Sequence, residues 1–355
     1  IEGLKFEKNK INQKVNNTQN FIKKSENSFN KNNNKSRRLP RIDLAFMINC
    51  LISFSLMRLI LPQTNTISYI KLIINKKGDD IKIYETCMNC NFPNGVIIND
   101  DEISSTARTQ SLTQSINIIK LKWNCDKDSM YSLFYNCIDI EEIDFSDFHC
   151  TKMGMTSLFM GCKSLTSVKF TTRINVMEAG NMFSGCSKLK SLDISKLDFS
   201  KVENMYNMFR DCSSLVSLIL PNLNKTIAKS LDYLFSGCSS LTSLNLSNFD
   251  TSYATNMEGM FSNCSLLTSL DLSSFITNNV TRVNEMFYNC SKLEYINLKN
   301  ARINISKAYY YGIFNYTPGN LVIFSYDETW LKILSACKIY INCLYNPYTN
   351  YEFQI

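Results

Sequence analysis

Apolar residues recur with a long period through the second half of this chain. A Phe is followed three residues later by a Cys, and apolar residues then stand three, six and eight positions after that Cys, such as Leu241, Leu244 and Leu246 after Cys238. Seven copies matching at five positions indicate a repeat architecture, in which each coil buries its apolar side against the next. The Phe and Cys pairs, 24 to 26 residues apart, are Phe134 and Cys137, Phe159 and Cys162, Phe183 and Cys186, Phe209 and Cys212, Phe235 and Cys238, Phe261 and Cys264, and Phe287 and Cys290.

Each copy predicts a strand, a turn and a helical turn. The alternating apolar pair at its end predicts a short strand with every second side chain pointing inward. Met257, Met260 and Phe261 are spaced as on one face of a helical turn, and the Asn and Asp residues of 247–252 favour a turn. The period is that of leucine-rich repeats. We therefore expect an α/β leucine-rich-repeat solenoid of about seven coils of 24–26 residues, with a parallel β-sheet on its concave face and small capping regions at both ends.

The wording of the repeat resembles a known family. "MFSNCSLLTSLDLSSF" (260–275) and "FDTS" (249–252) look like the BspA-like leucine-rich repeats of microbial surface proteins. The resemblance covers residues 122–303, about half of the chain. Residues 171–180 lack the Asn-Phe-Asp turn and residues 221–230 begin with Pro instead, so local irregularity on the convex side of the solenoid is expected there. The resemblance implies a surface-exposed binding or adhesion protein.

The segments flanking the solenoid have different patterns. Residues 66–85 read as strand, turn and strand, and residues 115–124 as another strand, so 64–121 is interpreted as a β-rich N-terminal cap. Residues 304–355 are Tyr-rich and break the period. Within them, 320–343 reads as strand, helix and strand, which indicates a C-terminal cap similar to the segment that closes some members of the family.

The first 63 residues form no part of the predicted solenoid. Residues 1–41 are rich in Asn and Lys and read as a disordered basic tail. Residues 42–63 contain an apolar run, Leu44–Leu61, interrupted by Asn49 and Arg58. Eighteen residues is the lower limit for a membrane span, and the basic residues before the run would keep the tail in the cytoplasm. A signal peptide and a buried helix of the folded body are the alternatives.

Charge argues against nucleic-acid binding by the solenoid. The net charge of the 355 residues is +7, but residues 1–41 hold eleven Lys and Arg against three Glu, which gives +8 and leaves about −1 for the rest. A nucleic-acid-binding body would need a basic face. The single His, His149, also removes most acid–base chemistry.

Thirteen of the fourteen cysteines fall into two groups. The seven of the repeat would lie about 4.8 Å apart in neighbouring coils with their side chains pointing the same way, which is poor disulfide geometry. They are interpreted as buried, unpaired core residues, with a redox or metal role as the alternative. Outside the cell the natural disulfide pool comprises Cys87, Cys90, Cys125, Cys150, Cys337 and Cys343. Six cysteines allow fifteen connectivities, and Cys337 with Cys343 is the one local pairing we predict.

No constellation for catalysis or metal binding stands out. Cys87 and Cys90 make half a zinc site and lack a second pair. His149 and Cys150 are adjacent, so on a strand their side chains point apart. Nucleophile elbow, P-loop and dinucleotide-binding motifs are missing from the sequence. We expect no enzyme activity, no cofactor and no metal site.

A partner would bind to the strand side chains that point away from the core. These columns are mostly small and polar, with few aromatic anchors, which favours a polar protein or glycan partner held weakly at each copy. A merely soluble strand face is the alternative. Asn245 also begins a glycosylation sequon, and a glycan there would crowd the face. The candidate partner-binding residues are Asp144, Lys169, Asp193, Asn245, Asp271, Asn297, Ser191, Ser243 and Ser269.

Two functional readings follow. The first is a secreted or single-pass cell-surface protein, anchored in the membrane through residues 44–61, that binds a protein or glycan through its concave face. The second is an intracellular leucine-rich-repeat scaffold for protein–protein interaction, in which all fourteen cysteines are reduced.

Overall fold

The computed structural model divides the chain into two compact units, 1–65 and 66–355. It describes residues 67–85, 93–103, 107–125, 128–302 and 308–327, together with Trp330, Ile333 and the backbone of Cys343 and Leu344. All of these belong to the second unit. The basic tail, the apolar run 44–61, and Cys87, Cys90 and Cys337 lie outside the described residues.

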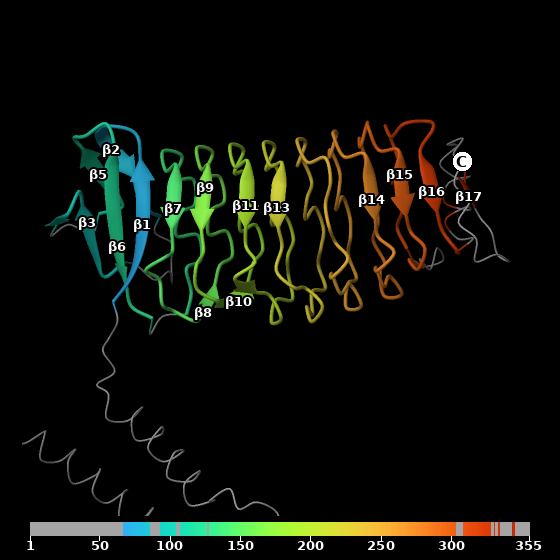
Figure 1. Cartoon of the computed structure of the whole chain (residues 1–355), viewed down its shortest axis with the longest axis horizontal. Helices are drawn as coiled ribbons and strands as arrows, with labels where there is room; N and C mark the ends of the chain where they lie inside the picture. The colour runs from blue at the N-terminus through green and yellow to red at the C-terminus, as the bar shows by residue number, and fades with distance from the viewer. Residues whose placement is uncertain are drawn as a thin grey trace, which may run out of the picture. The chain divides into compact units, whose positions relative to one another are not determined.

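An antiparallel sheet precedes the repeats and continues into them (Figure 1). Strand β1 (Ser68–Ile74) pairs with β6 (Asn117–Trp123) on one side and with β7 (Glu142–Asp144), the strand of the first coil, on the other. Alternate side chains of β1 and β6 are buried. The two strands expected in 66–85 are present, but β2 (Gly78–Lys82) pairs with β5 (Thr109–Leu112) rather than with β1. Strands β3 (Gly95–Ile98) and β4 (Asp101–Ile103) complete the outer edge.

The repeats form a β-solenoid in which every coil but one contributes a short strand to the same side (Figure 1). Coils are numbered here from the one that contains Phe134 (coil 1) to the one that contains Phe314 (coil 8). The strands pair in parallel, residue against equivalent residue, as in Asp193 with Ile219 and Asp271 with Asn297. The repeat strands are β7, β9 (Ser167–Lys169), β11 (Ser191–Asp193), β13 (Ser217–Ile219), β14 (Ser269–Asp271), β15 (Tyr295–Asn297) and β16 (Val322–Phe324).

A second parallel ladder runs along another side of the coils. It begins as the sheet of β8 (Lys152–Gly154), β10 (Ile174–Glu178) and β12 (Leu197–Asp198). Isolated bridges such as Ser230 with Asn256 and Asn256 with Arg282 continue it toward the C-terminus. Coils 6 and 7, for example, are therefore tied to each other at two separate places, by β14 (Ser269–Asp271) with β15 (Tyr295–Asn297) and by the bridge between Asn256 and Arg282.

The segment before each Cys consists of stacked turns, not of the helical turn that its apolar spacing favours. Met257, Met260 and Phe261 are buried as expected, but the backbone N–H of Phe235 donates to the carbonyl of Met260 in the next coil, at 2.9 Å. Positive φ angles, such as 76° at Gly237, occur in every coil and are incompatible with an α-helix. They explain why the residue before each Cys is Gly, Asn or Asp, the types that adopt this conformation most readily.

The core is a column of Phe rings beside a column of thiols. Rings from Phe134 to Phe314 stack between neighbouring coils, with centroids 5.0 Å apart for Phe159 and Phe183 and 5.8 Å for Phe235 and Phe261. The seven repeat cysteines are buried and unpaired, which confirms the interpretation made from their spacing.

The stack extends one coil further than the sequence period suggests. Phe314 stacks on Phe287 at 5.4 Å, and β16 pairs in parallel with β15. Thr317 takes the Cys position, and its hydroxyl donates to the carbonyl of Phe314. Strand β17 (Cys343–Leu344) then pairs with β16. The period is hidden because coil 8 is 27 residues from coil 7 and lacks the Cys.

Candidate binding surface

The outward side chains of the repeat strands form one exposed face, called the strand face here. It comprises the first and third residues of β7, β9, β11, β13, β14 and β15 and, in coil 5, Ser243 and Asn245. Lys169, Asp193 and Asp271 are exposed, whereas Asp144 and Asn297 are half-buried. Ser191, Ser243 and Ser269 are exposed beside them. All nine candidate residues therefore lie on the strand face; whether a partner touches them stays a prediction.

Most acidic and amide residues of this face have a local structural role. The Oδ1 atom of each accepts a hydrogen bond from the backbone N–H two residues later, as Asp193 does from Ser195 at 2.9 Å and Asp271 from Ser273 at 2.9 Å. Asp144, Asn245 and Asn297 make the same bond. Such bonds set the turn that leaves the strand. The bond from the Ser195 N–H also lowers the pKa of the Asp193 carboxyl. The recurrence of Asp and Asn at this position is thus explained without a ligand.

Charge is distributed unevenly along the strand face. At the N-terminal end Asp144 and Lys169 of neighbouring coils form an ion pair with 3.7 Å between Oδ2 and Nζ. Within the described part of the chain, neither Asp193 nor Asp271 belongs to an ion pair with Lys or Arg. The strand face of coils 4 and 5, which lies between these two carboxylates, carries no charged side chain.

Coil 4 departs from the pattern at two linked positions. Ile219 stands where coils 3 and 6 have Asp, and Pro221 stands where they have the Ser that donates its N–H. Ile219 has no side-chain acceptor and Pro221 has no N–H, so the turn bond is lost with both of its partners. Val216 and Ile219 are instead exposed apolar side chains, at 54% and 53% of their surface.

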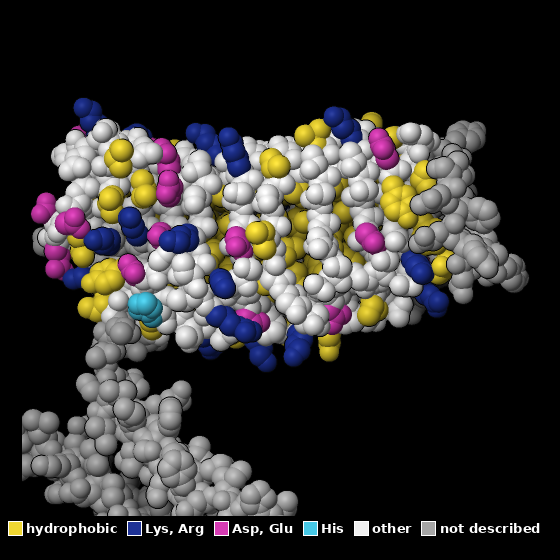
Figure 2. Space-filling view, viewed as in Figure 1, with side chains coloured by type: hydrophobic (Ala, Val, Ile, Leu, Met, Phe, Trp, Pro, Cys, Tyr) yellow, Lys and Arg dark blue, Asp and Glu magenta, His cyan; other side chains and the backbone are white. Residues whose placement is uncertain are grey.

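A groove opens beside this departure. In the part of the chain that the structure describes, β13 pairs with β11 only, and residues 242–245 of coil 5 pair with neither neighbouring strand. The groove between coils 4 and 5 has a volume of about 280 Å³, and seven of its nine lining residues are apolar. Hydrophobic side chains are visible in the recess between β13 and β14 in Figure 2. We call it the coil 4–5 groove; its lining includes Leu218, Ile219, Leu220, Pro221, Asn245 and Leu246.

Sequence reasoning did not find this groove. The departure at Pro221 was visible, and it was expected to disturb the convex side of the solenoid. The structure places the disturbance on the strand face instead, because Pro221 directly follows the strand and Leu220. The signal in the sequence was that Ile219 and Pro221 together replace the acceptor and the donor of the turn hydrogen bond.

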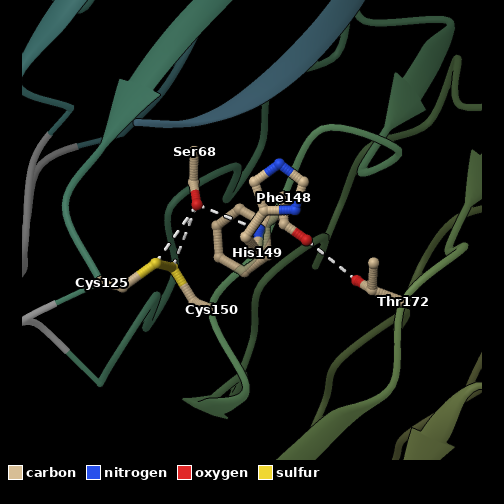
Figure 3. The surroundings of a disulfide bond; sticks show 6 residues. All are labelled: Ser68, Cys125, Phe148, His149, Cys150 and Thr172. Atoms are coloured by element: carbon tan, nitrogen blue, oxygen red, sulfur yellow. Dashed lines mark hydrogen bonds between the residues drawn. A yellow bond between two sulfur atoms is a disulfide. The ribbon is translucent and has the colours of Figure 1, made fainter. Parts of the chain in front are cut away.

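A disulfide joins the N-terminal sheet to the first coil. Cys125 follows β6 and Cys150 precedes β8, and their sulfurs are bonded with the Cα atoms 5.1 Å apart (Figure 3). The hydroxyl of Ser68, at the start of β1, lies 3.2 Å from the Cys125 sulfur and accepts the N–H of His149 at 3.0 Å. Because a disulfide sulfur carries no proton, Ser68 is the donor to it. Cys150 therefore has no free thiol that His149 could activate.

The sequence left this pair open, since it occurs in several of the fifteen connectivities. The two Cys are one repeat of 25 residues apart, as the repeat cysteines are, and only the structure shows that these two side chains are joined. The local pairing predicted for Cys337 and Cys343 falls outside the described side chains and stays a prediction.

The repeat thiols are expected to be unreactive. Burial raises the pKa of Cys162, Cys212 and Cys290 to about 12, and that of Cys238 well above its ordinary value. A thiol with so high a pKa is almost wholly protonated near neutral pH, and the thiolate is the reactive form. The described residues bring no three metal-binding side chains together. Among the same residues, no helix has the length and apolar character needed to span a membrane.

Comparison with known proteins identifies the repeats. The model of the BspA type leucine rich repeat region matches residues 82–206 and 129–247. The repeats in residues 82–247 belong to the BspA-like leucine-rich-repeat family. A second family model, described as a Mycoplasma protein of unknown function, matches residues 220–314. A leucine-rich repeat protein of known crystal structure from Bacteroides ovatus is 19% identical, with a TM-score of 0.29 over 58% of this chain and 60% of that chain. No curated protein matches.

Proposed function

We propose that this leucine-rich-repeat protein is secreted or displayed at the cell surface, where it binds a protein or glycan partner through its strand face. The family supports a repeat protein that works by interaction rather than by catalysis. The observation that carries the binding role is the strand face itself, an array of exposed polar side chains presented at regular spacing by successive coils. Such arrays suit partners that make many weak contacts.

The cysteines support an oxidising compartment. Cys125 and Cys150, which are not among the seven repeat cysteines, are joined, and structural disulfides are typical of secreted and surface proteins. The seven repeat thiols are compatible with that compartment because they are buried, which keeps them away from oxidants and from exchange with the disulfide. An anchor in residues 44–61 remains part of the proposal; those residues lie outside the described structure.

The alternative is an intracellular scaffold, and the seven unpaired thiols are the observation that favours it. Protease protection separates the two. Intact cells are treated with protease and then probed with an antibody against the repeats. Loss of the repeat signal, with cytosolic marker proteins preserved, is expected for surface display. Protection of the repeats in washed cells, together with no repeat protein in the medium, would overturn the proposal in favour of the scaffold.

Gel mobility provides an independent check of the compartment. The denatured chain should migrate faster without reductant than with it, because the Cys125–Cys150 bond closes a loop. Glycosidase treatment tests the exposed sequons, which include Asn224, Asn245 and Asn279. Asn263 and Asn289 are half-buried and hydrogen-bonded to each other, Nδ2 to Oδ1 at 2.9 Å, so they are expected to stay unmodified in the folded chain. No mobility shift in either test would contradict an extracellular location.

A further inference from the structure

The coil 4–5 groove and its flanking carboxylates have the features of a single peptide site. Seven of the nine residues that line the groove are apolar, and Asn245 and Asn248 add polar groups to it. Its column of the strand face runs Asp193, Ile219, Asn245, Asp271 through coils 3 to 6. The column thus places one apolar depression between two acidic side chains that belong to no ion pair among the described residues. Figure 2 shows hydrophobic side chains in the recess and acidic side chains on the same face.

Spacing sets the shape of the complementary ligand. The Phe rings of coils 3 to 6 are stacked 5.5 to 5.8 Å apart, so three such steps separate Asp193 from Asp271 by roughly 17 Å. In an extended peptide, residues 1, 3 and 5 point to the same side and residues 1 and 5 are about 13 Å apart. A peptide that crosses the coils can therefore place its middle side chain in the groove while its first and fifth side chains reach the two carboxylates.

We propose that the coil 4–5 groove, with Asp193 and Asp271, binds an extended peptide segment of the pattern basic–x–apolar–x–basic. The proposal rests on the proposed binding role of the strand face and names the class of partner. Charge complementarity selects basic ends, because each exposed carboxylate attracts a cation more strongly than it attracts a neutral group. The apolar lining selects a Leu-like centre, because burying such a side chain contributes more than burying a small polar one.

Carboxylates at the same position elsewhere provide an internal comparison. Asp144 makes the same turn bond as Asp193 but is held in an ion pair with Lys169. It lies on β7, two coils before β11 and three before the groove. Because Asp144 itself belongs to the strand face, the matched control is Asp79, an exposed carboxylate of β2 that lies outside that face.

The test is fluorescence anisotropy of labelled synthetic peptides titrated with the purified full-length chain. The probe has the core Lys-Ser-Leu-Ser-Lys between glycines, and two control peptides replace both Lys by Glu or the Leu by Ser. The probe is expected to bind at least tenfold more tightly than either control, and its affinity should fall as salt is raised. Equal binding of the three peptides, or preference for a neutral oligosaccharide over all of them, would overturn the proposal.

Chain variants then locate the site. The double change Asp193→Asn and Asp271→Asn keeps both turn acceptors and removes both charges, and it is expected to weaken the probe about fivefold to tenfold. Asp79→Asn should leave the affinity unchanged; an equal loss there would mean a diffuse charge effect and no site. Thermal unfolding confirms that each variant is folded. Because the purified chain is used, failure here is independent of the compartment tested on intact cells.

Discussion

The thiol of Cys238 donates to the backbone carbonyl of Phe209 in the preceding coil, with 3.2 Å between sulfur and oxygen. The same carbonyl accepts the backbone N–H of Cys212 at 3.2 Å, so both lone pairs of one buried oxygen are used. The arrangement repeats along the stack, for example from Cys264 to Phe235 and from Cys290 to Phe261. Cysteine suits this position because it is small, largely apolar and still a weak donor.

Truncating one side chain in the column of thiols, and one in the column of Phe rings, tests how much each column contributes to stability. Cys238→Ala is expected to lower the free energy of unfolding by about 1–2 kcal/mol, through lost packing and the weak hydrogen bond. Phe235→Ala should cost about 3–5 kcal/mol, because it removes a ring stacked on both sides. Urea unfolding followed by circular dichroism measures both. If Cys238→Ala lowers the free energy of unfolding more than Phe235→Ala does, the rings are not the main source of stability between coils.

Alkaline pH should destabilise the fold through the same thiols. Burial raises the pKa of Cys212 to about 12, from 9.0 for an unhindered thiol. Because the folded pKa is the higher one, the contribution to stability is complete below pH 9 and is lost as the pH rises from there toward 12. The free energy of unfolding should therefore fall between pH 9 and 10.5. Cys212→Ala removes one titrating thiol, so the free energy of unfolding should fall less steeply with pH in this variant. An unchanged slope would show that groups other than Cys212 cause the fall.

Removing the disulfide should loosen the junction between the N-terminal sheet and coil 1. The bond closes a loop of 25 residues, for which chain entropy gives about 2–4 kcal/mol. The double change Cys125→Ala and Cys150→Ala should lower the free energy of unfolding by that amount. Thiol labelling of the denatured, unreduced protein provides the control, since it should modify the repeat cysteines from Cys162 to Cys290 but neither Cys125 nor Cys150. Oxidation of these repeat cysteines would contradict the structure.

The turn bonds of the strand face can be separated from partner binding. Asp193→Ala removes the acceptor for the Ser195 N–H and should cost about 1 kcal/mol. Asp193→Asn keeps the acceptor and should be nearly neutral at pH 7. Because the bond from Ser195 lowers the pKa of Asp193, the wild-type contribution should be lost as the pH falls below about 4, whereas the Asn variant should lack this dependence. Equal stability of the Ala and Asn variants would contradict a role for the bond.

The sequence by itself determined the coil and what lies inside it. Phe235, Cys238 and Leu241 recur at fixed offsets because each coil presents the same environment to the next, so one copy predicts all others. The strands of the repeat and the unpaired buried thiols followed from that periodicity. The turns before each Cys did not, because apolar spacing alone cannot distinguish a helical turn from stacked turns held by bonds between coils, such as that from Phe235 to Met260.

Only the tertiary structure decided the features that join distant segments. Strand β1 pairs with β6 and β7 rather than with β2, and Cys125 joins Cys150 among fifteen connectivities, because these choices depend on how the N-terminal sheet covers coil 1. The coil 4–5 groove is of the same kind. Ile219 and Pro221 look like two ordinary substitutions in one copy, and their effect appears only where the strand of coil 4 meets that of coil 5, since a gap between neighbours is a property of two coils and not of either sequence.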